Sequence, residues 1–292
     1  MSRFKILMLI LLTLCVTANA GAEDNKRSIP ISIKASGSFI SGSDFKDSKA
    51  AVTVAGGKID IKATGFSFSY EGKNYSWDNV DKLNFGNGVD DPWNTLHRIA
   101  IGYSHFGKIN KNWFYGAGIT GTSAFEEEMS NSFGAAVRGN IGYIFNDNWK
   151  ALIGARVFTN SVRTSAMPFV SIMYENYKED GSGIFMTLGA LSEAGYAFSN
   201  TEKIRFKFGL DGKTYRLKNS STVASKGYIT TSSMMTGAYF DWKPFKGFSL
   251  SVGPEYYFAR EMKTYDEHGN KFGGASKQDA AIGGSLTFGY KF

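Results

Sequence analysis

Apolar and polar residues alternate along most of this chain, most clearly over the last fourteen residues, 279–292. One set of alternate positions is apolar or aromatic apart from a single glycine, and the positions between are small or polar. Successive side chains of a strand point to opposite faces, so this pattern predicts a β-strand with one apolar face. Alternating or β-branched runs predict the other strands, at residues 31–39, 51–55, 59–70, 96–106, 113–119, 133–145, 149–157, 168–174, 184–188, 194–198, 204–210, 228–242 and 248–258.

The strand count depends on two connections. If Gly56-Gly57 and residues 189–193 are both turns, the chain has fourteen strands, and if neither is a turn it has twelve. We predict fourteen, because an even count with both termini on one side and the long segment 71–95 on the other requires the turn at Gly56-Gly57. The apolar phase slips near Gly65, which predicts a β-bulge there.

The predicted connections are alternately short and long. Segments 41–48 and 71–95 have no period and predict loops, whereas the short turns fall at residues 108–112, 146–148, 176–183, 199–203 and 243–247. Antiparallel strands with short turns on one side and longer loops on the other are typical of bacterial outer-membrane barrels. We therefore predict an all-β fold, a single transmembrane antiparallel up-and-down β-barrel over residues 21–292. A soluble all-β domain is the alternative for the same alternation.

The end of the last strand favours the membrane barrel. The chain ends on Phe292, with Tyr290 two positions earlier. This ending resembles the assembly signal of Gram-negative outer-membrane β-barrels, and the resemblance implies recognition by the barrel assembly machinery. Residues 167–198, with a Met-Pro strand start and a tyrosine at the strand end, resemble a family of bacterial outer-membrane barrel proteins without known activity. The chain departs from that family in lacking a second proline near Leu188.

The amino terminus carries an export signal. Arg3 and Lys5 precede an apolar run, residues 6–16, which is too short for a membrane-spanning helix and ends in small residues. We expect a signal peptide over residues 1–20, cleaved after Ala20, and delivery to the outer membrane, with its lipid and lipopolysaccharide as partners. Cys15 is the only cysteine and lies inside this signal, so the mature chain has no disulfide, thiol catalysis or thiolate metal site.

Composition agrees with an exported barrel. The 34 glycines, 24 phenylalanines and 15 tyrosines suit a barrel better than a soluble enzyme, and no later segment forms a long apolar run. The formal net charge of +7 would suit a nucleic-acid partner, but an exported chain does not routinely meet one. Three tryptophans, Trp113, Trp149 and Trp242, lie beside short turns on the apolar phase of their strands, which predicts one half of an aromatic girdle.

The polar phase of the strands carries the charges. A charge in hydrocarbon costs about 2–4 kcal/mol at the midplane, so these side chains are predicted to line the lumen. The basic members are Lys34, Lys62, Arg98, Arg138, Lys150, Arg156, Arg205, Lys207 and Lys213, and the acidic members are Asp60, Glu175, Asp211, Asp241 and Glu255. Basic residues predominate, so an open lumen would enrich anions. We expect Arg138, Arg156, Arg205 and Lys207 to set this preference.

Catalysis has little support. The histidines are His97, His105 and His268. His97 shares the apolar phase of its strand, as the base of a barrel lipid hydrolase would, but no serine lies beside it in the sequence. Asp90-Asp91 lacks the spaced oxygens of a calcium loop. We predict no catalytic residues, no metal and no cofactor.

Two functions remain. The first is a passive pore or transporter for small solutes, including anions, because side chains alone do not fill a lumen of fourteen strands. The second is a structural or surface-interaction barrel whose longest loop contacts a partner through Tyr75, Trp77, Phe85 and Trp93.

Overall fold

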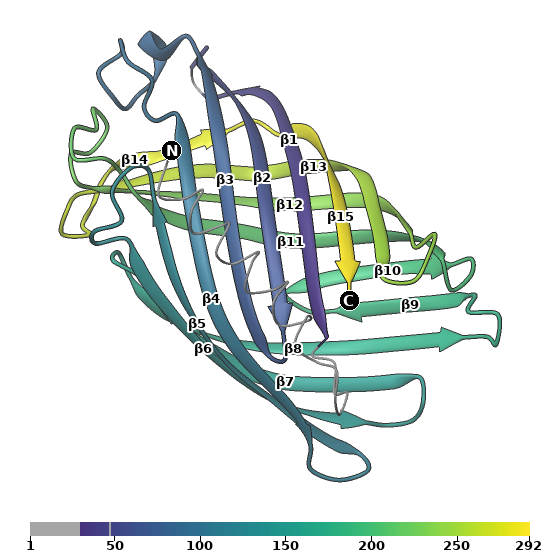
Figure 1. Ribbon diagram of the computed structural model, residues 1–292. Coiled ribbons are helices and arrows are strands. Elements are labelled where there is room, and N and C mark those ends of the chain that lie inside the picture. The colour runs from purple at the N-terminus through teal and green to yellow at the C-terminus, as the bar shows by residue number, and fades with distance from the viewer. Residues whose placement is uncertain (1–29, 47) are drawn as a thin grey trace, which may run out of the picture.

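A computed structural model describes residues 30–46 and 48–292 and shows a closed antiparallel barrel. Its wall has fourteen strand positions, here called staves. From β1 to β14 each strand pairs with the next along the chain, and the β13–β15 and β1–β15 pairings complete the ring (Figure 1). The strands are β1 (Ile31–Asp44), β2 (Ala51–Ala63), β3 (Phe66–Asp78), β4 (Thr95–Lys108), β5 (Trp113–Phe125), β6 (Phe133–Ile144), β7 (Trp149–Thr159), β8 (Thr164–Tyr177), β9 (Gly183–Leu188), β10 (Leu191–Ala197), β11 (Glu202–Arg216), β12 (Tyr228–Trp242), β13 (Phe248–Tyr265), β14 (Lys271–Gln278) and β15 (Ala281–Lys291).

The last stave is built from two strands. β13 pairs with β15 over residues 248–257 and with β14 over residues 260–265, so β14 and β15 together occupy one position in the ring. The switch occurs at a bulge, where Ala259 has a φ of 49° and the register with β12 shifts. β14 was not predicted from the sequence.

The predicted count of fourteen staves is confirmed, but one predicted turn is wrong. Gly56 and Gly57 lie inside β2, paired with Ser38 and Gly37 of β1. The turn falls instead at Thr64-Gly65, where the φ angles are 43° and 86°, so the bulge predicted at Gly65 is also wrong. Two consecutive positive φ angles match the twist of a tight hairpin, which explains the glycine at the second position.

Two loops predicted from the sequence are shorter than expected. β3 continues to Asp78, so the long connection covers residues 79–94 and contains a short 3-10 helix, Val80–Lys82. β1 continues to Asp44, past an irregularity between Ile40 and Ser43. The predicted turn near Gly189 is present between β9 and β10.

The barrel has two different ends. The short turns predicted from the sequence all lie at one end, here called the short-turn end, together with the start of β1 and the end of β15. The opposite end, here called the long-loop end, carries residues 79–94, 126–132 and 217–227. In Figure 1 the short-turn end is at the lower right and the long-loop end at the upper left.

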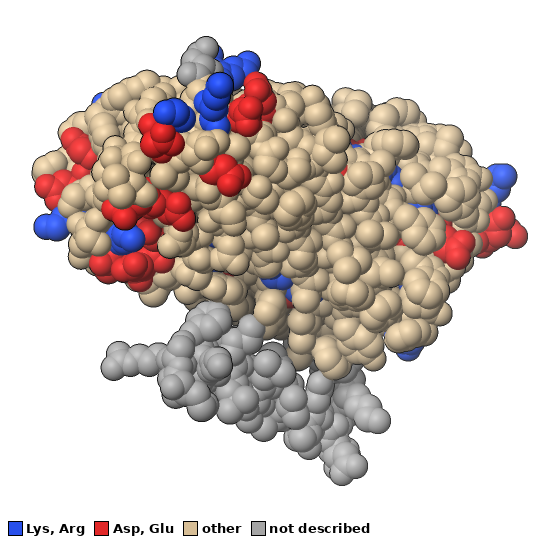
Figure 2. All heavy atoms as spheres, turned by 90° about the horizontal axis from the view of Figure 1, so that it is seen from above, with Lys and Arg blue, Asp and Glu red and all other residues tan. Residues whose placement is uncertain are grey.

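The outward surface is mostly apolar between these ends. The outward positions carry the alternating apolar row, and many are strongly exposed, among them Phe66, Ile119 and Phe206. Figure 2 shows charged side chains gathered at the two ends of the molecule, with a largely uncharged face between them. Within residues 30–46 and 48–292, no helix is long and apolar enough to span a membrane. The predicted signal peptide lies outside the described residues.

Candidate functional site

An apolar cluster, here called the plug, fills the long-loop end of the lumen. It combines inward-facing residues of the strands with residues of the loops, and Trp93, Leu96, Leu217 and Ile229 in it have no exposed surface. Its buried members are Phe45, Ala50, Val52, Val54, Tyr75, Trp93, Leu96, Ala124, Tyr215, Leu217, Val223, Ala224, Ile229 and Met262. The lumen is therefore closed by a packed core at this end.

The plug contains the aromatic residues on which the surface-interaction alternative depended. Tyr75 and Trp93 are buried, and Trp77 and Phe85 pack against them. The rings of Trp77 and Trp93 meet edge to face at 4.9 Å, and the Trp77 indole N–H donates to the Trp93 carbonyl at 2.8 Å. These four side chains pack into the lumen and do not form an exposed binding surface.

The rim of the barrel folds inward beside the plug. Phe125 at the end of β5 forms a bridge with Arg216 at the end of β11, although these strands are far apart in the ring. The Glu126 amide donates to the Arg216 carbonyl at 2.8 Å, and the Glu126 carboxylate accepts from the Lys218 amide at 2.9 Å. Burial raises the pKa of Glu126, and this effect outweighs the stabilising influence of Lys218.

A network of four charges crosses the lumen below the plug. Lys73 of β3 contacts Asp211 of β11 at 3.1 Å, and Lys213 of β11 contacts Glu71 of β3 at 2.9 Å. The two strands are separated by five strands in one direction around the ring and by seven in the other. These ion pairs therefore join opposite walls. Glu71 is the most buried of the four, so loss of Lys213 would leave the most buried charge of the network without its nearest partner.

A cavity of about 340 Å³ includes this network and extends below it. The carboxylate of Glu255 lies in its wall and accepts hydrogen bonds from Tyr239 and Tyr257 at 2.5 Å and from Ser285 at 2.8 Å. Lys207 also lines the cavity. The part of the chain that the structure describes contains no carboxylate in ion-pair contact with Lys207.

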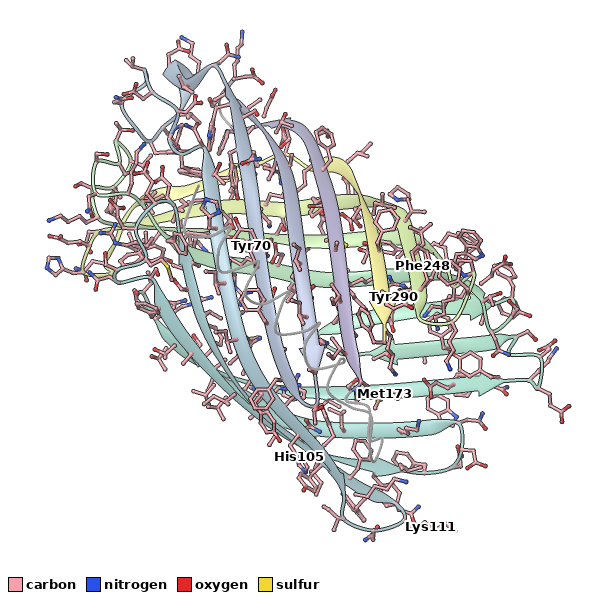
Figure 3. The ribbon with its side chains drawn as sticks, viewed as in Figure 1. Tyr70, His105, Lys111, Met173, Phe248 and Tyr290 are labelled. Atoms are coloured by element: carbon pink, nitrogen blue, oxygen red, sulfur yellow. The ribbon has the colours of Figure 1, made fainter. Side chains whose placement is uncertain are left out.

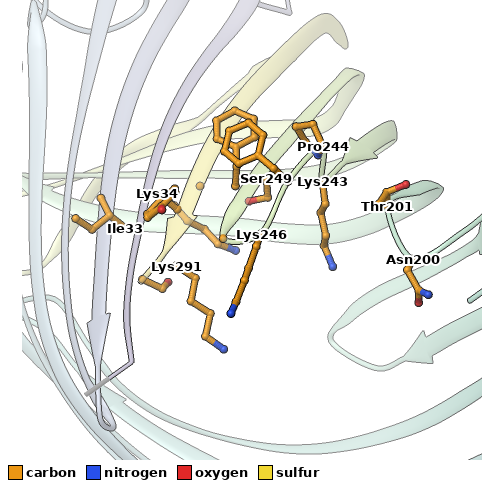
Figure 4. Close-up of a pocket in the computed structure, with 15 residues that line it drawn as sticks. Ile33, Lys34, Asn200, Thr201, Lys243, Pro244, Lys246, Ser249 and Lys291 are labelled. Atoms are coloured by element: carbon orange, nitrogen blue, oxygen red, sulfur yellow. The ribbon is translucent and has the colours of Figure 1, made fainter. Parts of the chain in front are cut away.

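The short-turn half of the lumen, here called the vestibule, contains three cavities of about 800, 520 and 370 Å³. The 520 Å³ cavity shares lining residues with each of the other two, and the smallest shares Thr287 with the cavity below the plug. Figure 4 shows several lysine side chains around the middle one. The vestibule cations without a carboxylate in ion-pair contact, among residues 30–46 and 48–292, are Lys34, Lys62, Arg138, Arg156, Lys243, Lys246 and Lys291.

Arg138 and Arg156 are like charges at directly paired positions in the vestibule wall. They are direct cross-strand partners on β6 and β7, and both line the 800 Å³ cavity. Each guanidinium lies over a phenylalanine ring, Arg138 at 5.7 Å from the centroid of Phe106 and Arg156 at 5.8 Å from that of Phe158. Like charges directly opposite each other destabilise a sheet, so this pair favours an anion between or beside them.

The other predicted lumen residues fall into ion pairs or lie deeper. Lys150 contacts Glu175 at 3.3 Å, and Arg205 contacts Asp241 at 2.7 Å. Arg98 lies on β4 between the inward residues Leu96 and Ala100, close to the plug.

Sequence reasoning missed eight charged residues that line the described cavities, among them Lys58, Glu193 and Lys203. Glu71 and Lys73 were assigned to a loop, because the outward positions beside them on β3 are no longer apolar. Lys243 and Lys246 lie in a turn, where no strand phase applies. Lys291 was visible as the polar phase of the last strand, and it lines two vestibule cavities.

The outward aromatic residues gather at the short-turn end. Trp113, Trp149 and Trp242 begin or end their strands there, each about 40% exposed, and Trp149 meets Tyr174 at 4.6 Å. Phe248 and Tyr290 are partners on neighbouring strands at the same end (Figure 3). This arrangement is compatible with the girdle predicted from the sequence.

The surroundings of His97 do not support the lipid-hydrolase alternative. His97 Nδ1 is 2.9 Å from the Tyr70 hydroxyl, and the His97 ring packs beside Phe125. Its hydrogen-bond partner is thus a phenol and not a serine. The described residues also hold no cluster of three or more His, Cys, Asp or Glu arranged to bind a metal.

Comparisons place the chain beside solved barrel structures at low similarity. No protein-family model and no curated protein matches it. The NanC porin is 12% identical with a TM-score of 0.38, covering 89% of this chain and 100% of its own. The KdgM porin is 11% identical with a TM-score of 0.36 (89% and 99%). An outer-membrane channel from Pseudomonas putida F1 is 7% identical with a TM-score of 0.45 (93% and 98%). Such values carry no conclusion about transport by this chain.

Proposed function

We propose that this protein is an outer-membrane β-barrel that passes small anionic solutes, with the plug as its gate. The short-turn end faces the periplasm, as short turns do in bacterial barrels, and the long loops face outward. Solutes then meet the vestibule at the periplasmic mouth and the plug at the outer mouth.

The Arg138–Arg156 pair is the observation that carries the proposal. Two arginines occupy directly paired positions on neighbouring strands, with no carboxylate in ion-pair contact among the described residues. Five lysines share the vestibule with them, and none of these has a carboxylate in ion-pair contact in the part of the chain described: Lys34, Lys62, Lys243, Lys246 and Lys291. A low-dielectric wall lined by one sign of charge concentrates counter-ions. The vestibule should therefore hold anions above their bulk concentration.

The test is ion selectivity in a planar bilayer under a KCl gradient, at low salt where screening is weak. We expect an anion-selective reversal potential for the native chain. In Arg138→Glu with Arg156→Glu, the anion-to-cation permeability ratio should fall, because two of the seven unpaired vestibule cations among the described residues become carboxylates.

The matched control is Lys111→Glu with Lys178→Glu, which changes the total charge equally at two exposed residues of the short turns. Its reversal potential should remain close to that of the native chain. A cation-selective native pore, or an unchanged reversal potential after both arginines are replaced, would reject the anion-pore proposal.

A further inference from the structure

The barrel wall has a gap beside the lumen. β9 and β10 have only 6 and 7 residues, whereas their neighbours β8 and β11 have 14 and 15. β8 pairs with β9 only over residues 172–177, and β11 pairs with β10 only over residues 203–209. Above the β9–β10 turn, residues 164–171 and 210–215 therefore each have one edge without a described strand partner.

The gap is closed at its long-loop end and open along the free edges of β8 and β11. The Asn160 side chain at the end of β7 reaches the Thr214 hydroxyl at 3.4 Å, and the Phe125–Arg216 bridge lies above it. Each free edge has about six to eight residues, or about 20–25 Å of strand, and two missing strands leave β8 and β11 about 14 Å apart at the base. The gap, here called the window, is thus a tapered opening in the wall.

The height of the window places it in the outer half of the apolar band. Tyr174 of β8 pairs with Trp149 at the short-turn end, and Phe169 is five residues farther along the strand. Five residues correspond to about 16 Å of strand, or about 12 Å of height at a tilt of ~40°, against an apolar band ~25 Å tall. An open sheet edge is not tolerated against bare lipid, because each N–H or C=O group without a hydrogen bond there costs several kcal/mol. The free edges of β8 and β11 must therefore face water or a polar ligand.

The cavity below the plug reaches the base of the window. Its lining includes Leu191, Gly209 and Leu210, which form that lower corner, together with Lys207 inside. Leu191 lines this cavity yet is 53% exposed, and Met167 on the inward phase of β8 is 49% exposed. On the outward side Val170, Leu188 and Leu210 are exposed. From Lys207 in the cavity, apolar side chains therefore lie along the path through the wall to the outside.

We propose that the window is a lateral passage for anionic amphiphiles between the lumen and the outer leaflet. Lys207 receives the anionic head group, and the alkyl chain passes Leu191 and Met167 into the lipid. The inference rests on the proposed function, since it names a substrate class for the same lumen. It also supplies an exit that does not require the plug to open.

The test compares two sulfonates with one head group in proteoliposomes. Methanesulfonate reports the anion pore, and decanesulfonate, which remains charged and crosses lipid slowly, reports the window. In Met167→Trp with Leu191→Trp, decanesulfonate flux should fall about tenfold because the passage narrows, while methanesulfonate flux stays at the native level. The matched control Ile119→Trp with Val137→Trp places the same rings at exposed outward positions of β5 and β6, away from the window, and should change neither flux.

The outcomes separate the two proposals. If no variant passes methanesulfonate, the anion pore fails, and the window is still decided by the ratio of decanesulfonate fluxes in the blocked and control variants. An equal decanesulfonate flux in those two variants would overturn the window. A parallel loss of both sulfonates in the blocked variant would overturn it too, because the tryptophans would then obstruct a common axial path. Heat-modifiable migration of every variant confirms that its barrel is closed.

Discussion

Removing the central ring of the plug should open the outer mouth. Trp93 has no exposed surface and meets the rings of Trp77, Tyr75 and Phe85 at centroid distances of 4.9, 5.8 and 6.0 Å. It belongs to the loop of residues 79–94 and to no strand of the ring. Its contacts therefore stabilise the closed loop far more than the barrel wall.

The size of the effect follows from this burial. Replacing a buried tryptophan by alanine costs about 3–5 kcal/mol. If the substitution destabilises only the closed state, by ~3 kcal/mol, the ratio of open to closed molecules rises about 100-fold, since about 1.4 kcal/mol corresponds to a factor of ten. Trp93→Ala should therefore turn a mostly closed barrel into one with frequent, long openings.

Single-channel recording measures the open fraction directly. The matched control is Val89→Ala in the same loop, because Val89 is 78% exposed and is not among the residues of the plug. We expect native gating in Val89→Ala and a large rise in open time in Trp93→Ala, with heat-modifiable migration retained by both. Native closed times in Trp93→Ala, or equal opening in the two variants, would refute the plug as the gate.

Two further predictions concern pH and assembly. Burial raises the pKa of Glu126, so the stability that its protonation gives the closed rim is full below the ordinary glutamate pKa and is lost as pH rises through the raised pKa. Closed times in single-channel records should therefore lengthen on acidification. Glu126→Gln should remove this pH dependence. Phe292 donates its amide to the Ile31 carbonyl at 2.9 Å, so its deletion should lower the amount of barrel inserted in the outer membrane, whereas Phe145→Asp, at an exposed position of the same end, should have little effect. Native insertion without Phe292 would argue against its role as assembly signal.

The sequence predicts the barrel where only one face of a strand is apolar. In β15 the outward row is apolar and the inward row small or polar, so phase and extent are both readable. The same holds for Arg138 and Arg156, whose inward phase is evident from the apolar rows beside them. Hydrocarbon outside and polar lumen inside leave a period of two in the sequence.

That signal fails near the plug for a physical reason. Val52 and Val54 of β2 face inward yet are apolar, because they pack into the plug, and this made residues 51–55 look like a separate strand. Farther along β3, Glu71 and Lys73 face inward beside outward residues that are no longer apolar. Pairing across the lumen, as between Lys73 and Asp211, depends on the height and curvature of two distant strands, which no local pattern encodes.

The pairing of β1 with β15, here called the seam, constrains how the barrel assembles. It joins the first strand to the last, and the Ser36 and Thr287 hydroxyls within it meet at 2.9 Å although 251 residues separate them in the chain. Closing so long a loop is entropically costly and contributes nothing until the final residues arrive. Until that seam forms, the incomplete sheet keeps two free edges, each able to pair with another chain. The unclosed barrel therefore needs protection from other chains until the carboxyl-terminal strand docks.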